Sequence, residues 1–268
     1  MAGDALTRAL ERVAALPRLV VASDFDGTLA PFVHDPMTAR AAAGGLDVLR
    51  ELAGMPGTQV AVVSGRDVAT LTQLTGIPAG PWTPQEAGAG DRQPPIVLVG
   101  SHGAQSSVAG VAGGVDAEGL ELRRDSLVAA LRAVALRHTG TRVEVKATAA
   151  ALHTRGLPAA VARDAEEEAA ALGTSRRDVR VIVGNSVVEL SLSHADKGSA
   201  LLALLAQWRA DALVYFGDDT TDEDAFMKMN PGRDVAVKVG DGDTAAGFRV
   251  DGPEQVVAAL RQLADARR

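Results

Sequence analysis

The sequence predicts an α/β fold: a Rossmann-like core built on a parallel sheet, with a smaller α+β domain inserted into it. Four short apolar runs, each ending in polar or Gly-rich residues, indicate strands that are buried on both faces. The carboxyl ends of parallel strands meet at one edge of a sheet, so the polar residues that follow these strands predict a site there. The strands are expected at residues 19–22, 60–63, 96–99 and 213–216.

The sequence between and around these strands is compatible with helices. The first predicted helix is amphipathic and ends at Pro17, because proline cannot continue the hydrogen-bond pattern of a helix. Residues 79–95 are rich in Pro and Gly and are expected to form a surface loop. Helices are expected at residues 5–16, 39–52, 68–74 and 199–208.

The stretch from about residue 110 to residue 193 has a different pattern. Its order of helix, strand, strand, helix, strand, strand predicts a small antiparallel sheet backed by two helices. We therefore expect a core domain formed by residues 1–108 and 194–268, and an inserted cap domain at 109–193. Within the cap domain, helices are expected at 123–138 and 158–172, and strands at 141–146, 149–154, 179–183 and 187–192.

Composition narrows the classes of function. The 268 residues include 27 Lys and Arg against 34 Asp and Glu, a net charge of −7 that argues against a nucleic-acid partner. The chain has no cysteine, which excludes disulfides and thiolate metal sites and is consistent with an intracellular protein. No apolar run is long enough to span a bilayer. We expect a soluble, cytoplasmic protein with no membrane partner.

The segment Asp24-Phe25-Asp26-Gly27-Thr28 directly follows the first predicted strand. Asp-Gly pairs are common in ordinary turns, so this segment alone does not establish chemistry. A second acidic segment, Gly217-Asp218-Asp219-Thr220-Thr221-Asp222, follows the last predicted strand. It could be an acidic helix start, yet clustered carboxylates repel one another unless a cation lies among them, and hard oxygen ligands favour Mg²⁺.

Two further residues could bind a phosphate at the same edge of the sheet. Lys197 precedes a predicted helix and could balance the charges of Asp24 and a phosphate, although a lone Lys there is usually a surface residue. Ser64 follows the second strand and could hold a phosphate oxygen or simply cap the next helix.

Together these segments resemble the haloacid dehalogenase superfamily of phosphatases. The resemblance implies that Asp24 attacks phosphorus and forms an aspartyl phosphate, and that Asp26 acts as general acid and then as general base. It also implies that Thr28, Ser64 and Lys197 hold the transferring phosphoryl group. Such an arrangement positions the reactants and neutralises charge, as phosphoryl transfer requires.

The same resemblance implies a Mg²⁺ cofactor. The expected ligands are Asp24, the backbone carbonyl of Asp26 and Asp218, with Asp222 and Asp219 in direct or supporting positions.

Polar residues in the predicted cap domain suggest sugar recognition. Alternation places Glu144 and Lys146 on one face of a strand, where the pair could hydrogen-bond sugar hydroxyls or form an ordinary salt bridge. His153 and Arg155 could take part or could pair with acidic neighbours.

The full set of motifs resembles the trehalose-6-phosphate phosphatases. The resemblance implies that Glu144, Lys146 and Glu189 bind the glucose units, that His102 and Arg66 also contact the substrate, and that a trehalose-phosphate synthase supplies it. The matching segments are Asp24–Pro31, Ser64–Arg66, Gly100–Gly103, Glu144–Lys146, His153–Arg155, Asp196–Gly198 and Gly217–Phe226.

The sequence departs from the family pattern after Glu189. Many members have a basic, Pro-containing tract there, whereas this chain has Leu190-Ser191-Leu192-Ser193-His194. This departure bears on the role of Glu189. Two other functions are compatible with the sequence. One is a phosphatase of the same fold that acts on sucrose phosphate or a mannosyl phosphate. The other is a catalytically silent domain that binds sugar phosphates, which the presence of Asp24 and Asp26 argues against.

Overall fold

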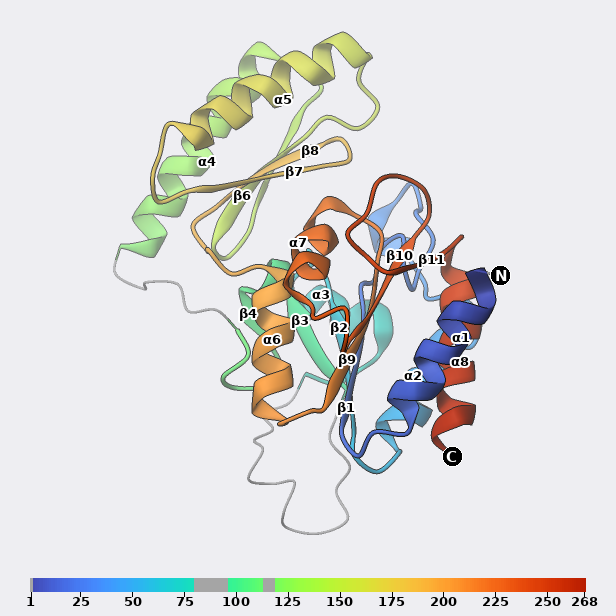
Figure 1. The fold of residues 1–268 in the computed structure, drawn as a ribbon. Helices are drawn as coiled ribbons and strands as arrows, with labels where there is room; N and C mark the ends of the chain where they lie inside the picture. The colour runs from blue at the N-terminus through green and yellow to red at the C-terminus, as the bar shows by residue number, and fades with distance from the viewer. Residues whose placement is uncertain (1, 80–95, 113–118) are drawn as a thin grey trace. The chain divides into compact units, whose positions relative to one another are not determined.

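The computed structural model describes residues 2–79, 96–112 and 119–268 (Figure 1). The chain divides into two compact units, one formed by residues 1–112 and 195–268 and the other by residues 113–194. The surface loop predicted for residues 79–95 lies, apart from Ala79, outside the described residues. In the parts of the chain that are described, no helix is both long and apolar enough to cross a membrane.

The first unit contains a seven-stranded sheet in the order β11-β10-β9-β1-β2-β3-β4. The six strands from β11 to β3 are parallel to their neighbours, and β4 pairs antiparallel with β3. This confirms the predicted α/β fold and adds three strands to the four that were expected. The strands are β1 Leu19–Ser23, β2 Thr58–Val63, β3 Val97–Gly100, β4 Gln105–Ser106, β9 Ala212–Gly217, β10 Val235–Val239 and β11 Phe248–Val250.

Helices cover both faces of this sheet (Figure 1). Alternate side chains of β1 enter different hydrophobic clusters: Leu19 and Val21 pack with α1, α2 and α8, whereas Val20 and Ala22 pack with α6 and α7. Burial on both faces explains why residues 19–22 of the strand are all apolar. The helices are α1 Ala2–Ala14, α2 Gly45–Ala53, α3 Val68–Thr75, α6 Lys197–Gln207, α7 Thr220–Lys228 and α8 Pro253–Arg267, with short 3₁₀ turns η1 Pro36–Thr38 and η3 Ser101–Gly103.

Helix α2 begins six residues later than the helix predicted from residue 39. Gly44 has a left-handed φ of 77°, a conformation outside the helical region, and it precedes the first helical residue. The segment before it instead pairs with the turn that follows β1, because the Ala42 N–H donates to the Leu29 carbonyl at 2.8 Å. Tertiary contacts therefore override the helical propensity of the alanines.

The second unit is an antiparallel sheet in the order β5-β6-β8-β7, with α4 and α5 against one face. Side chains such as Leu131, Ala165 and Leu190 form a hydrophobic cluster between the sheet and the two helices. The expected order of elements is present. The bounds are α4 Leu120–Arg137, β5 Arg142–Val145, β6 Ala149–His153, α5 Ala159–Thr174, β7 Arg180–Gly184 and β8 Val187–Ser191.

Candidate active site

The two acidic segments of the first unit follow two neighbouring strands, β1 and β9. The chain leaves β1 toward α2 and leaves β9 toward α7, and these helices lie on opposite faces of the sheet (Figure 1). Such a reversal of strand order opens a crevice at the carboxyl edge of an α/β sheet. The Asp24 N–H donates to the Phe216 carbonyl at 2.9 Å, which fixes the loop after β1 against the end of β9.

A tight turn after β1 carries the first acidic segment. Gly27 has a φ of +85°, and its N–H donates to the Ala30 carbonyl at 2.7 Å. A Cβ at Gly27 would lie only 2.3 Å from Oδ2 of Asp218. Position 27 therefore requires glycine for two reasons: its backbone is left-handed, and the second acidic segment approaches it closely. Thr28, on the same turn, donates from Oγ1 to Oδ1 of Asp218 at 3.1 Å.

Asp222 is the anchor of the second acidic segment. Asp219 caps α7, so Asp222 emerges from the first turn of that helix and is fully buried. Its Oδ1 accepts hydrogen bonds from Lys197 and Tyr215, and its Oδ2 accepts from the backbone N–H groups of Asp218 and Asp219. Four donors use the acceptor capacity of one carboxylate, so Asp222 is suited to holding this loop in place.

Lys197 is the central cation of the site. Asp196 caps α6 through a reciprocal capping box, which places Lys197 at the first helical residue, where its side chain is 1% exposed. Lys197 Nζ lies 2.8 Å from Oδ1 of Asp24, 2.8 Å from Oδ1 of Asp222 and 3.6 Å from Oδ1 of Asp219. One ammonium group therefore contacts carboxylates from both acidic segments.

The charge of this cluster is not balanced by Lys197 alone. Burial raises the pKa of Asp24 well above its ordinary value, Lys197 opposes this shift, and the neighbouring Asp222 and Asp218 add to it. Burial likewise raises the pKa of Asp218 to about 7, with repulsion from Asp222 and Asp219 adding to the shift. Carboxylates held together in this way favour a bound cation, which would relieve the repulsion.

The donor set fits a hard divalent cation. Asp24, Asp218 and Asp222 each offer a carboxylate oxygen, and these oxygens lie within 4.8 Å of one another. Carboxylate oxygens are ligands that Mg²⁺ accepts. Asp24 and Asp218 are better placed to coordinate directly than Asp222, because Asp222 already accepts four hydrogen bonds.

The remaining predicted residues of the first unit lie on the segments that follow β1, β2 and β3. Asp26 pairs with Arg66 through both carboxylate oxygens. Ser64 is 1% exposed, and its Oγ accepts the Arg66 N–H at 3.2 Å. His102 lies in η3 with a φ of 53°, and its ring packs where a Cβ on Gly65 would be, so Gly65 leaves room for the imidazole.

The predicted sugar-binding residues of the second unit lie on or beside its sheet and take part in one salt bridge and one hydrogen bond to a histidine. Glu144 pairs in register with Ala151, which in turn pairs with Glu189. Lys146 Nζ lies 2.5 Å from Oε2 of Glu189, and His153 Nε2 lies 2.6 Å from Oε2 of Glu144. Lys146 therefore forms a salt bridge, but with Glu189 on another strand rather than with Glu144. Arg155 follows the end of β6.

Sequence reasoning missed two buried residues next to the acidic segments. Tyr215, on β9, is fully buried and donates to Asp222. Lys238, on β10, is 5% exposed, donates to the Asp218 carbonyl and lies 3.6 Å from Oε1 of Glu223. The signal for Lys238 was its place inside the strand-like run Val-Ala-Val-Lys-Val, where a buried charge needs partners.

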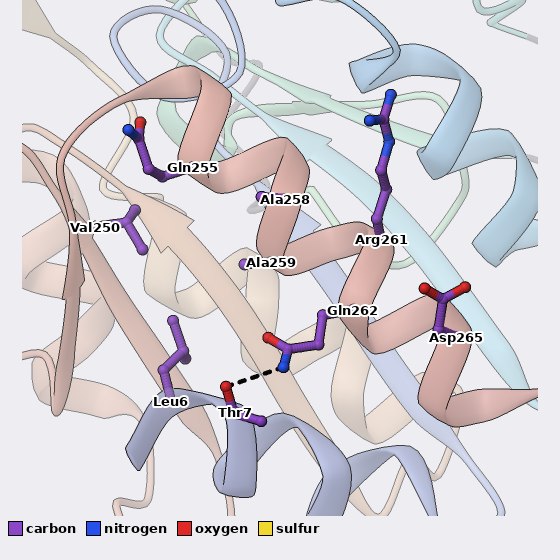
Figure 2. Close-up of a pocket in the computed structure, with 9 residues that line it drawn as sticks. All are labelled: Leu6, Thr7, Val250, Gln255, Ala258, Ala259, Arg261, Gln262 and Asp265. Atoms are coloured by element: carbon purple, nitrogen blue, oxygen red, sulfur yellow. Dashed lines mark hydrogen bonds between the residues drawn. The ribbon is translucent and has the colours of Figure 1, made fainter. Parts of the chain in front are cut away.

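The first unit also has a groove that is separate from the candidate active site. Figure 2 shows a groove lined by residues of α1, β11 and α8, across which the Gln262 amide donates to Oγ1 of Thr7 at 2.9 Å. None of the predicted site residues lines it.

The chain is similar to proteins of one family. A family model described as trehalose-phosphatase matches residues 22–80 and 83–254. The trehalose-phosphate phosphatase of Mycobacterium tuberculosis (strain ATCC 25618 / H37Rv) is 35% identical over 269 residues, an alignment that covers 90% of this chain. It covers 60% of the mycobacterial protein, so the chain spans less than two thirds of that relative's length.

Solved structures share the fold. The C-terminal domain of Candida albicans trehalose-6-phosphate phosphatase superposes with a TM-score of 0.75 at 21% identity, covering 97% of this chain and 96% of that domain. The C-terminal domain of the Candida albicans trehalose synthase regulatory protein superposes with a TM-score of 0.68 at 13% identity, covering 95% and 97%.

Proposed function

Because the chain belongs to the trehalose-phosphatase family, we propose that it hydrolyses trehalose 6-phosphate to trehalose and phosphate, with Mg²⁺ as cofactor. The observation that carries this proposal is the buried contact between Lys197 and Asp24, placed among the carboxylates of the second acidic segment. It provides a nucleophile held in one orientation beside a cation that can also bind a phosphate.

In the first step a carboxylate oxygen of Asp24 attacks phosphorus. The bond between phosphorus and the sugar oxygen breaks, and Asp26 donates a proton to that oxygen, so trehalose leaves as an alcohol. Lys197, Thr28 and Ser64 hold the oxygens of the transferring phosphoryl group.

In the second step water attacks phosphorus of the aspartyl phosphate. Asp26, now a carboxylate, accepts a proton from the water, and the bond between phosphorus and the Asp24 oxygen breaks. Phosphate leaves, and Asp24 and Asp26 return to their starting states.

Asp24 and Asp218, with the backbone carbonyl of Asp26, would hold Mg²⁺, and Asp222 and Asp219 would support them. When bound, the ion neutralises negative charge on the carboxylates and on the phosphate.

We assign sugar recognition to Glu144, Lys146 and Glu189, with His102 as a further substrate contact. Charged side chains that share one face of a sheet can hydrogen-bond several hydroxyls of a disaccharide. The reaction that supplies the substrate would be the one catalysed by a trehalose-phosphate synthase.

The rival function is a silent domain that binds sugar phosphates. A domain of the Candida albicans trehalose synthase regulatory protein shares the fold, so the fold alone does not decide between the two functions. The presence of Asp24, Asp26 and Lys197 at one sheet edge favours the phosphatase.

Phosphate release from a panel of esters tests the proposal. The panel contains trehalose 6-phosphate, sucrose 6-phosphate, glucose 6-phosphate and a mannosyl phosphate, each measured with Mg²⁺ and with EDTA. We expect Mg²⁺-dependent release with a preference for trehalose 6-phosphate, and no release by Asp24→Asn. A preference for another ester would refute the substrate, and persistent release by Asp24→Asn would refute the aspartyl-phosphate mechanism. No release from any ester would favour the silent domain.

A further inference from the structure

Arg66 and Asp26 form a two-point contact at the candidate active site. Arg66 Nε lies 2.5 Å from Oδ2 of Asp26, and Arg66 Nη2 lies 2.6 Å from Oδ1. The two side chains are 14% and 28% exposed, so the pair is partly shielded from water. Parallel hydrogen bonds of this kind fix the orientation of a carboxylate as well as its position.

The backbone of Arg66 is itself held at both ends of the residue. Its N–H donates to Oγ of Ser64 at 3.2 Å, and its carbonyl accepts the Ser101 N–H at 2.7 Å. The guanidinium carbon lies 5.9 Å from the centroid of the Phe25 ring, within the range of a cation–π contact. The Arg66 guanidinium that contacts Asp26 therefore extends from a loop held by hydrogen bonds and lies over the buried ring of Phe25.

We propose that Arg66 is a positioning residue that acts on the reaction through Asp26, by holding its carboxylate in the orientation needed for proton transfer. The inference rests on the proposed function, in which Asp26 gives a proton to the sugar oxygen and later accepts one from water. Proton transfer requires the donor and acceptor atoms within hydrogen-bond reach, so a carboxylate free to rotate loses catalytic efficiency. Both oxygens of Asp26 contact Arg66, and this contact sets the rotation of the carboxylate.

The role differs from the substrate contact that family resemblance implies for Arg66. A residue that binds substrate directly contributes whether or not Asp26 is functional. A residue that acts only through Asp26 contributes nothing once Asp26 can no longer transfer protons. The two roles therefore predict different couplings between substitutions at these two positions.

A double-mutant cycle separates the roles. Turnover is measured for the wild type, Arg66→Met, Asp26→Asn and the double variant, on whichever ester of the panel the wild type hydrolyses. We expect Arg66→Met to lower kcat about 10²-fold, the scale of general acid–base catalysis, with little change in KM. In the Asp26→Asn background, the same substitution should change kcat by no more than about twofold. Equal losses in the two backgrounds, or a loss confined to KM, would overturn the proposal.

The rate of the first step on an ester with a good leaving group gives a second measurement, and a misfolded variant would not reproduce its expected result. A good leaving group such as p-nitrophenolate needs no proton, so the burst of p-nitrophenolate should form in Arg66→Met at a rate within about twofold of the wild type. A burst slowed as much as sugar-phosphate turnover would show a general loss of the site and refute the positioning role.

Two more variants complete the design. Arg66→Lys keeps the charge but loses the fork, so we expect it to restore less than about a tenth of the lost kcat. Full rescue by lysine would show that charge alone suffices and would overturn the role of the fork. Arg50→Met is the matched control, because Arg50 makes an exposed pair with Asp47 on α2, and its kinetics should equal those of the wild type. A wild type without turnover on any ester would refute the proposed function and this inference with it, whereas normal wild-type turnover with additive losses refutes the inference alone.

Discussion

Lys197 and Asp24, 173 positions apart in the sequence, meet in a buried contact of 2.8 Å between Nζ and Oδ1. The two side chains are 1% and 4% exposed. Removing Lys197 would leave the carboxylates of Asp24 and Asp222 without their shared cation in a site largely closed to water. The pair therefore links the folding of the first unit to its proposed chemistry.

Replacing Lys197 by methionine should destabilise the protein and abolish turnover. Met fills much of the same volume but leaves Asp24 and Asp222 without their shared cation. Breaking a buried ion pair in this way costs about 3–5 kcal/mol in the free energy of unfolding. Urea denaturation at constant pH, without added metal, measures the loss. The control is Arg50→Met, whose partner is exposed and whose cost should stay within about 0.5 kcal/mol. A Lys197→Met variant as stable as this control would contradict the prediction.

Replacing Asp218 by asparagine should separate metal binding from stability. Burial and the neighbouring Asp222 raise the pKa of Asp218 to about 7, which shows that its negative charge is unfavourable in the folded state. Asp218→Asn removes that charge, so the metal-free variant should unfold at a higher temperature than the metal-free wild type. Mg²⁺ at about a hundredfold excess over its dissociation constant should stabilise the wild type by about 3 kcal/mol. Thermal unfolding with Mg²⁺ and with EDTA tests both parts, and an equal Mg²⁺ effect on the variant would remove Asp218 from the ligand set.

Replacing Tyr215 by phenylalanine should weaken the anchor formed by Asp222. The substitution keeps the buried ring and its contact with Phe226 but removes the hydroxyl that donates to Asp222. A lost hydrogen bond to a buried carboxylate costs about 1–3 kcal/mol. We expect a lower urea midpoint with an unchanged m-value and a smaller loss of activity than in Lys197→Met. An unchanged midpoint would show that Lys197 and the backbone N–H groups hold Asp222 without Tyr215.

Replacing Lys146 by alanine should affect sugar recognition and the stability of the second unit in separable ways. Lys146 is the ion-pair partner of Glu189, which is 5% exposed, so the single variant leaves a buried carboxylate unpaired. The double variant with Glu189→Gln should recover stability, because neither charge is then present. The KM for trehalose 6-phosphate should remain raised in both variants, while that for p-nitrophenyl phosphate should not change. Equal effects on the two substrates would exclude Lys146 from sugar recognition.

The pair formed by Glu144 and His153 predicts a pH-dependent stability. The hydrogen bond with His153 lowers the pKa of Glu144 from its ordinary value of 4.5, burial opposes this, and Lys146 lowers the pKa further. Because the folded-state pKa is the lower one, the stabilisation is complete above pH 4.5 and is lost as the pH falls through the folded value. The pair is partly exposed, so it contributes less than about 1 kcal/mol. The difference in Tm between the wild type and His153→Ala should shrink from pH 6 to pH 4, and a constant difference would contradict the assignment.

The sequence predicted the parallel sheet and the edge at which its polar residues gather. Strands buried on both faces are mostly apolar, and β1, β2, β3 and β9 each contain a continuous apolar run. The helix predicted from residue 39 was wrong over its first six residues, because the contact of Ala42 with the turn after β1 depends on residues that only folding brings near.

The pairings inside the site could not be predicted in the same way. Residue type and spacing indicated that Lys197 balances the charge of Asp24, and that the second acidic segment needs a cation. They did not indicate that Arg66 contacts Asp26, that Lys146 pairs with Glu189, or that Tyr215 and Lys238 reach the second acidic segment.

The sequence by itself therefore determined the class of fold, the order of the elements in the second unit and the chemical types that gather at one edge of the parallel sheet. These depend on local pattern: hydrophobic periodicity, turn residues and helix caps act over a few positions. Only the tertiary structure decided which donor meets which acceptor. A hydrogen bond or ion pair forms only when the distance between its atoms is right to within a few tenths of an ångström. That distance is set by packing between segments far apart in the chain.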